Sequence, residues 1–182
     1  KAALGSIIVV AVLQLLDVKY PKELWQKSRD EFYILLFTFF MTLLLGIKYG
    51  ILLGVFISLA YIVYRNSQPH IAVLGRIKGT SHFKNVSRFS KDVITYPNVL
   101  MLRFDGPLFF GNQRYFKAKI QELITMQAQP VKYLIIDAGP IHYIDATTFH
   151  MLRAWIADLQ QENTSVLWTQ LIGPIRDRFC EY

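Results

Sequence analysis

The sequence predicts a membrane α-helical segment followed by a small α/β domain, a mixed sheet with packed helices. Three observations lead to this fold class. Lys48 is the only formal charge among the 33 residues from Phe32 to Tyr64. Beyond residue 92, short apolar runs alternate with amphipathic ones, which is typical of strands and helices that follow one another in an α/β domain. Six basic residues and no acid lie between the apolar stretch and this alternating region, over residues 65–91.

The apolar stretch is too long for one crossing. As a single helix it would measure about 50 Å against a hydrocarbon core of about 30 Å. The glycines of Gly46–Gly50 predict a break, so we expect two helices over Phe32–Ile47 and Tyr49–Tyr64. Both are apolar all round, which favours membrane helices over buried core helices of a soluble protein. Gly50 and Gly54 have the spacing that allows helices to approach closely; we expect them to pack within the hairpin, with a dimer contact as the alternative.

The basic residues predict the orientation. A juxtamembrane cluster of Lys and Arg marks the cytoplasmic side and attracts anionic lipid headgroups. We therefore expect Arg65, Arg76 and Lys78 to contact headgroups and the domain after them to be cytoplasmic, in an integral protein of a plasma or inner membrane. A nucleic-acid binder is the rival interpretation, and its binding would fall steeply with salt. The position of the cluster at the membrane exit favours lipid, so we expect no nucleic-acid partner.

The remaining elements follow from periodicity. Four apolar runs are typical of strands: Ile71–Leu74, Val99–Phe104, Tyr133–Ile136 and Val166–Trp168. Tyr133–Ile136 is continuously apolar, which predicts a strand buried on both faces. A further short strand is expected over Leu108–Phe110. Three helices are expected, with Asn112 as N-cap of the first, Asp145 at the start of the second and Pro174 opening the third.

At this point the chain resembles the C-terminal part of SulP-family (sulfate permease) anion transporters, with the last membrane helices, a basic linker and a STAS domain. No single motif is decisive, but their order and spacing are specific. The matching segments are Leu24–Phe32, Gly46–Val55, Arg65–Pro69, Leu74–Arg76, Gly106–Asn112 and Asp137–Thr147.

The resemblance implies a secondary active transporter of sulfate or another small inorganic or organic anion, by symport or exchange, with a cytoplasmic STAS regulatory domain. It divides the chain into incomplete transmembrane helices (1–64), a basic linker with the start of the STAS domain (65–91) and the STAS domain (92–182). We expect truncation at both ends, with Ala2–Leu16 as part of a further helix. The family's anion site lies in earlier helices, so no substrate-binding residue is assigned. Expected partners are the lipid bilayer, the rest of the transporter, a small anion, a second copy in a homodimer and a regulatory protein.

The resemblance also marks one regulatory candidate. In STAS proteins that antagonise anti-sigma factors, the loop matching Asp145–Thr148 carries Asp-Ser-Ser-Gly, and its second serine is phosphorylated. Thr147 takes that position, Asp145 takes that of the aspartate, and Thr148 replaces the glycine. The alternative is that Asp145 is only an N-cap. A membrane-tethered STAS signalling module, which binds partners and is switched by phosphorylation, is the second functional hypothesis.

Nothing in the sequence predicts an enzyme. The four histidines and Cys180 do not form a metal-ligand pattern, and no phosphate-binding glycine motif is present. We therefore expect no catalytic residue, no metal and no cofactor.

Overall fold

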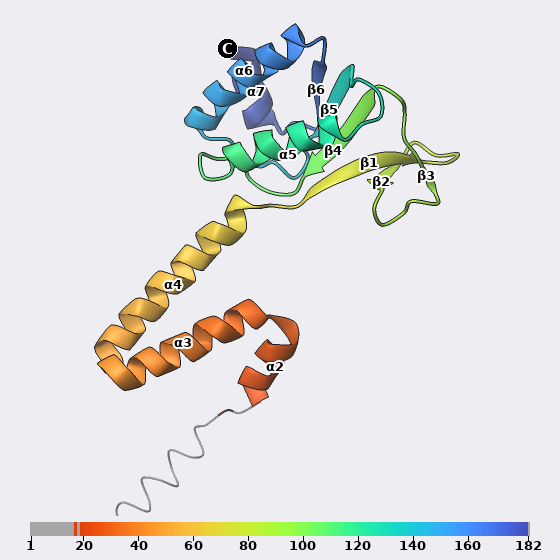
Figure 1. Cartoon of the computed structure of the whole chain (residues 1–182). Helices are drawn as coiled ribbons and strands as arrows, with labels where there is room; N and C mark the ends of the chain where they lie inside the picture. Colours follow the sequence, from red (N-terminus) through yellow and green to blue (C-terminus); the bar gives the residue numbers. More distant parts are fainter. Residues whose placement is uncertain (1–16, 18, 182) are drawn as a thin grey trace, which may run out of the picture. The chain divides into compact units, whose positions relative to one another are not determined.

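The computed structural model describes residue 17 and residues 19–181 (Figure 1). The helix expected over Ala2–Leu16 lies outside the described residues. The chain divides into two compact units between Ile62 and Val63, and each is considered by itself.

The first unit contains α2 (Lys19–Lys27), α3 (Arg29–Leu45) and most of α4 (Ile47–Ser67). The two expected apolar helices are confirmed, but the break between them is only Gly46, which has a positive φ of 85°. Helix α4 therefore begins at Ile47 rather than at Tyr49. Among the described helices, α4 alone has the length and hydropathy to cross a membrane. Helix α2 was not predicted from the sequence.

Small residues let α3 and α4 meet. Gly50 and Gly54 are the buried residues of α4. A Cβ atom at Gly50 would lie 2.5 Å from the Cα of Thr42, and one at Gly54 would lie 2.7 Å from Cγ2 of Thr38. The expected packing of the two glycines within the hairpin is confirmed. Each threonine hydroxyl donates to the carbonyl four residues earlier in α3, at 2.8 Å, so these polar groups are satisfied within their own helix.

The second unit is built on one mixed sheet with strand order β2-β1-β4-β5-β6. Strands β4, β5 and β6 are parallel, and β1 is antiparallel to β4, which confirms the expected mixed sheet. The strands of this part are β1 (Ile71–Ile77), β4 (Val99–Phe104), β5 (Tyr133–Asp137) and β6 (Ser165–Thr169).

Strand β1 pairs with three other strands. Its first residues, Ile71–Val73, pair with β4, and the rest pair with β2 (Phe83–Asn85) on one side and β3 (Val93–Ile94) on the other. The far half of β1 thus forms a three-stranded ribbon that extends from the main sheet, away from the helices (Figure 1). Neither β2 nor β3 was predicted from the sequence.

Three helices cover one face of the sheet: α5 (Gln113–Thr125), α6 (Ala146–Gln161) and α7 (Gly173–Glu181). They share one core with the strands, in which Phe116 of α5 contacts Phe104 of β4 and Trp155 of α6. The core side chains with no exposed surface include Leu102, Phe104, Leu134, Ile136 and Leu152. All three expected helices are confirmed.

Two strand predictions were wrong. Strand β5 is buried on one face only, because the helices lie on one side of the sheet; Leu134 and Ile136 point into the core, whereas Tyr133 is 49% exposed. The expected strand over Leu108–Phe110 is reduced to a single parallel bridge between Leu108 and Ile144. The rest of this segment belongs to a loop that leads into α5.

Candidate functional site

The loop of residues 105–112, between β4 and α5, touches two separate parts of the second unit. At its start, the Asp105 amide donates to the His70 carbonyl at 2.9 Å, on the segment that leaves α4. Further along, the Leu108 amide donates to the Tyr143 carbonyl at 2.9 Å, on the segment that enters α6. We call residues 105–112 the bridging loop, because it joins the exit of α4 to the start of α6.

Asn112 holds the bridging loop in shape. Its side chain has no exposed surface. The side-chain oxygen accepts from the Phe109 amide at 2.9 Å, and the side-chain nitrogen donates to the carbonyls of Pro107, at 2.8 Å, and of Asn66, at 3.2 Å. Asn112 is the N-cap residue of α5, as expected, but its side chain makes no cap hydrogen bond. Its amide is instead used within the loop and on the last turn of α4.

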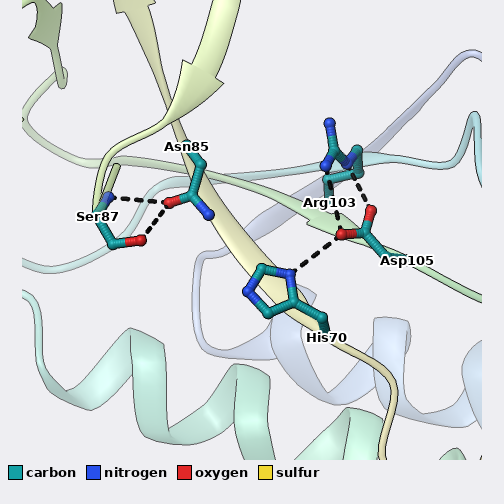
Figure 2. A network of polar contacts seen from close by, with 5 residues as sticks. All are labelled: His70, Asn85, Ser87, Arg103 and Asp105. Atoms are coloured by element: carbon teal, nitrogen blue, oxygen red, sulfur yellow. Dashed lines mark hydrogen bonds and ion pairs between the residues drawn. The ribbon is translucent and has the colours of Figure 1, made fainter. Parts of the chain in front are cut away.

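A charged cluster stands at the first residue of the same loop. Asp105 accepts hydrogen bonds from Nε of Arg103, at 2.6 Å, and pairs with Nδ1 of His70, at 3.1 Å (Figure 2). Burial acts to raise the pKa of the Asp105 carboxyl, but the hydrogen bonds and charges of Arg103 and His70 outweigh burial and hold that pKa below its usual value. The cluster therefore fixes the start of β1 against the end of β4.

The other end of the bridging loop meets the start of α6. Asp145 is the N-cap of α6: one carboxylate oxygen accepts from the Thr148 amide at 2.8 Å. The second oxygen accepts from the Phe110 amide at 2.8 Å. One carboxylate thus caps the helix and ties it to the bridging loop. Thr147 lies in the first helical turn and is exposed, and Phe110 is 70% exposed.

The ionisation of Asp145 contributes to stability. Burial acts to raise the pKa of its carboxyl, but hydrogen bonds from Thr148 and from the Phe110 amide favour the carboxylate more strongly, so the pKa lies below its usual value. Because folding lowers this pKa, the ionised carboxylate stabilises the folded state. The stabilisation is complete above the unfolded pKa of about 3.9 and is lost as the pH falls through the folded pKa.

Replacement of this carboxyl tests that role. We expect Asp145→Ala to lower the free energy of unfolding at pH 7 by about 1–2 kcal/mol, because the N-cap and the Phe110 amide both lose their acceptor. The difference from the parent chain should shrink as the pH falls below about 4, the unfolded pKa, and through the lower folded pKa, where the parent carboxylate becomes protonated. Denaturant unfolding of the detergent-solubilised chain, followed by tryptophan fluorescence, measures both quantities.

Asp158→Ala is the matched control for this prediction. Asp158 lies on the same helix, but its contact to Lys117 is long, at 3.9 Å, and exposed. An exposed pair of this kind contributes less than about 1 kcal/mol. Equal losses for the two variants, or a loss for Asp145→Ala that does not change with pH, would contradict the assigned role of Asp145.

The other residues predicted from the sequence to have a function lie outside the bridging loop, in different elements. Arg65 lies in the last turn of α4, Arg76 lies in β1, and Lys78 follows β1; all three are exposed. Within residues 17 and 19–181, no three His, Cys, Asp or Glu side chains gather as metal ligands. The side chain of Cys180 lies outside the described residues.

Sequence reasoning missed the residues that make the bridging loop a connection. Asp105-Gly106-Pro107 was recognised only as a turn, and Asn112 only as a helix cap. The local sequence gave no indication that Asn112 would bond to Asn66, which lies 46 residues earlier.

The sequence is similar to that of a known domain family and of known transporters. The STAS domain family matches residues 90–179. Sulfate transporter 4.1, chloroplastic, of Arabidopsis thaliana is 30% identical over 162 residues, 84% of this chain and 24% of the relative. High affinity sulfate transporter 2 of Stylosanthes hamata is 29% identical over 174 residues, 91% of this chain and 26% of the relative. The chain thus spans about a quarter of the length of these relatives.

Solved structures show the same fold. The murine Solute Carrier 26 family member A9 anion transporter, in the inward-facing state, matches all of this chain and 29% of its own, with a TM-score of 0.86 and 19% identity. A second structure of the same transporter matches 90% of this chain with a TM-score of 0.77 and 17% identity. Together with the sulfate transporter relatives, these matches cover the apolar helices as well as the α/β domain. The chain belongs to the SulP (sulfate permease) family and carries its C-terminal, STAS-containing part.

Proposed function

We propose that this chain is the C-terminal part of a secondary active transporter of sulfate or another small anion. In this proposal α3 and α4 form a membrane hairpin, and the second unit is a cytoplasmic STAS domain that regulates transport or supports a homodimer. The observation that carries the proposal is the extent of the similarity. The similarity to sulfate transporters runs over 162 residues, well beyond residues 90–179 that match the STAS family, and so includes the apolar hairpin.

Within the second unit, the end of α4 is linked to the bridging loop. Asn66, in the last turn of α4, is bonded directly to the buried Asn112 of the bridging loop. A displacement of the end of α4 would therefore strain the bond from Asn112 to Asn66. The bridging loop would pass this strain to the N-cap of α6 through the bond from the Phe110 amide to Asp145.

Uptake of radiolabelled sulfate tests the transport proposal. The complete transporter polypeptide that contains this chain is reconstituted in liposomes, with protein-free liposomes as the control. We expect saturable uptake that is reduced by excess unlabelled substrate. Competition by chloride, bicarbonate and dicarboxylates then ranks the anions. If none of these anions enters faster than into protein-free liposomes, the transport proposal is wrong and the tethered signalling module is favoured.

Phosphorylation of Thr147 is the regulatory part of the proposal. The Thr147 side chain is exposed in the first turn of α6, where free backbone N–H groups and the helix dipole stabilise a phosphate. The nearby Asp145 carboxylate would repel such a phosphate, so phosphorylation should weaken the bond from Phe110 to Asp145. Mass spectrometry of protein isolated from its own cells, with and without phosphatase treatment, tests for the modification. Transport by Thr147→Glu and Thr147→Val variants tests its effect.

A further inference from the structure

The ribbon made by β2, the far half of β1 and β3 carries most of the excess charge of the chain. We call residues 74–96 the basic ribbon. It holds five cationic residues and one acid, Asp92; the cations are Arg76, Lys78, Lys84, Arg88 and Lys91. All five are exposed. Across the described part of the chain, none of the five forms an ion pair with a carboxylate.

Large apolar side chains stand between these cations on the same surface. The pairing register places Phe83 of β2, Arg76 of β1 and Ile94 of β3 in one row, so their side chains share one face of the ribbon. Phe83 is 43% exposed and Ile94 is 37% exposed. The Arg76 guanidinium lies 5.7 Å from the ring centre of Tyr96, which is itself 44% exposed.

The opposite face repeats the combination. Nζ of Lys84 lies 4.5 Å from the ring centre of Phe89, which is 39% exposed. A soluble surface loop normally exposes charge without so many aromatic rings, whereas aromatic side chains between cations are typical of segments at a membrane interface. The basic ribbon therefore has both elements of interfacial binding: unneutralised positive charge, and apolar groups that can enter the headgroup layer.

We propose that the basic ribbon is a docking surface for an anionic phospholipid bilayer, with Lys84 and Arg88 on headgroups and Phe89 inserted between them. Charge complementarity selects an anionic partner. The covalent path favours lipid over a soluble polyanion, because the basic ribbon begins seven residues after the end of α4, the proposed membrane helix, a reach of at most about 25 Å. The inference is independent of which anion is transported and of Thr147.

A fluorescent label on the ribbon tests the proposal in the whole chain. With Cys180 replaced by serine, Ser90→Cys places a label in the exposed loop between β2 and β3, and Gln160→Cys places a control label on α6. Both chains are reconstituted in nanodiscs of phosphatidylcholine, with or without phosphatidylserine, and with brominated acyl chains as quencher. We expect phosphatidylserine to increase quenching at position 90 at least about twofold and to leave position 160 unchanged.

Two sets of variants identify the cause of the quenching. Lys84→Glu with Arg88→Glu should abolish the increase, since each cation near an anionic surface contributes about fivefold in affinity. The matched pair Arg114→Glu with Lys132→Glu changes the net charge equally, at exposed sites outside the ribbon, and should preserve the increase. Phe89→Ser should reduce quenching while the ribbon keeps its charge. Unchanged thermal unfolding of each variant shows that the fold is retained.

Three results would overturn the proposal. The first is equal quenching at positions 90 and 160 in both lipid mixtures. The second is a loss of the increase in the matched charge pair, which would indicate a general effect of net charge. The third is displacement of the label from lipid by a short RNA or an acidic peptide at low concentration, which would assign the basic ribbon to a soluble polyanion. A failure of anion uptake would leave each of these readouts unaffected, so the two proposals fail separately.

Discussion

Asn112→Ala is expected to lower the free energy of unfolding of the second unit by about 3 kcal/mol. The substitution removes an acceptor for the Phe109 amide and a donor shared by the carbonyls of Pro107 and Asn66. The site has no exposed surface, so water cannot replace these bonds without opening the loop. Each buried polar group that loses its partner costs about 1–3 kcal/mol, which makes Asn112 the most sensitive polar position described in this domain.

Asn112→Asp separates shape from hydrogen bonding. The substitution keeps an acceptor for the Phe109 amide but turns a carboxylate oxygen toward two carbonyl oxygens. We expect a loss at least as large as that of Asn112→Ala at pH 7 and a smaller loss at low pH, because a protonated carboxyl can donate one hydrogen bond. Denaturant unfolding at the two pH values measures this difference.

Hydrogen exchange locates the damage in these variants. We expect faster exchange at the Phe109 amide and through the bridging loop, with the parallel strands β4, β5 and β6 little changed. Gln121→Ala, at an exposed position of α5, is the matched control and should stay within about 0.5 kcal/mol of the parent chain. A loss for Asn112→Ala no larger than that of the control would show that the bridging loop does not depend on this side chain.

The elements with strong local patterns could be predicted from the sequence. Val99–Phe104 is β4 to the residue, because an apolar run ends at a turn of aspartate, glycine and proline. Helix α6 begins directly after Asp145, because an N-cap aspartate precedes a clear apolar stripe. In both segments the local preference and the final packing agree, which is the condition under which sequence patterns are reliable.

The features that sequence patterns did not predict depend on distant partners. Strand β2 has three residues and β3 has two, and each becomes a strand only because β1 continues beyond β4 to pair with it. Alternation over two or three residues carries no usable signal. The burial of β5 on a single face likewise depends on where the helices lie, which an apolar run such as Tyr133–Ile136 does not reveal.

In the candidate site, too, features with a local sequence pattern could be predicted, and contacts between distant residues could not. Asp145 was predicted as an N-cap because that signal is local, whereas Thr147 was singled out by the resemblance of its loop to that of other STAS proteins. The link from Phe110 to Asp145 spans 35 residues, and the link from Asn112 to Asn66 spans 46. These contacts make the helix cap part of a connection to α4, and they arise only when the bridging loop is folded between the two.

The hairpin provides the second large expected effect. Gly50→Ala should destabilise the packing of α3 on α4 by about 2–3 kcal/mol, because the added Cβ would lie 2.5 Å from the Cα of Thr42, and a backbone atom cannot move aside alone. Gly54→Ala should be milder. Its nearest neighbours, at 2.7 and 2.9 Å, are side-chain atoms of Thr38, which can change rotamer.

Cross-linking across the hairpin measures this packing directly. The Tyr61 hydroxyl donates to Asp30 at 3.1 Å, so cysteines at these two positions, in a Cys180→Ser background, can be bridged by a short bismaleimide. We expect the yield to fall in the order parent, Gly54→Ala, Gly50→Ala, with Thr38→Ala partly restoring Gly54→Ala. Ala60→Leu, an enlargement at an exposed position of α4, should leave the yield unchanged. If Gly50→Ala and Ala60→Leu behave alike, the glycines do not hold the hairpin, and a contact with a second copy becomes the better explanation of their spacing.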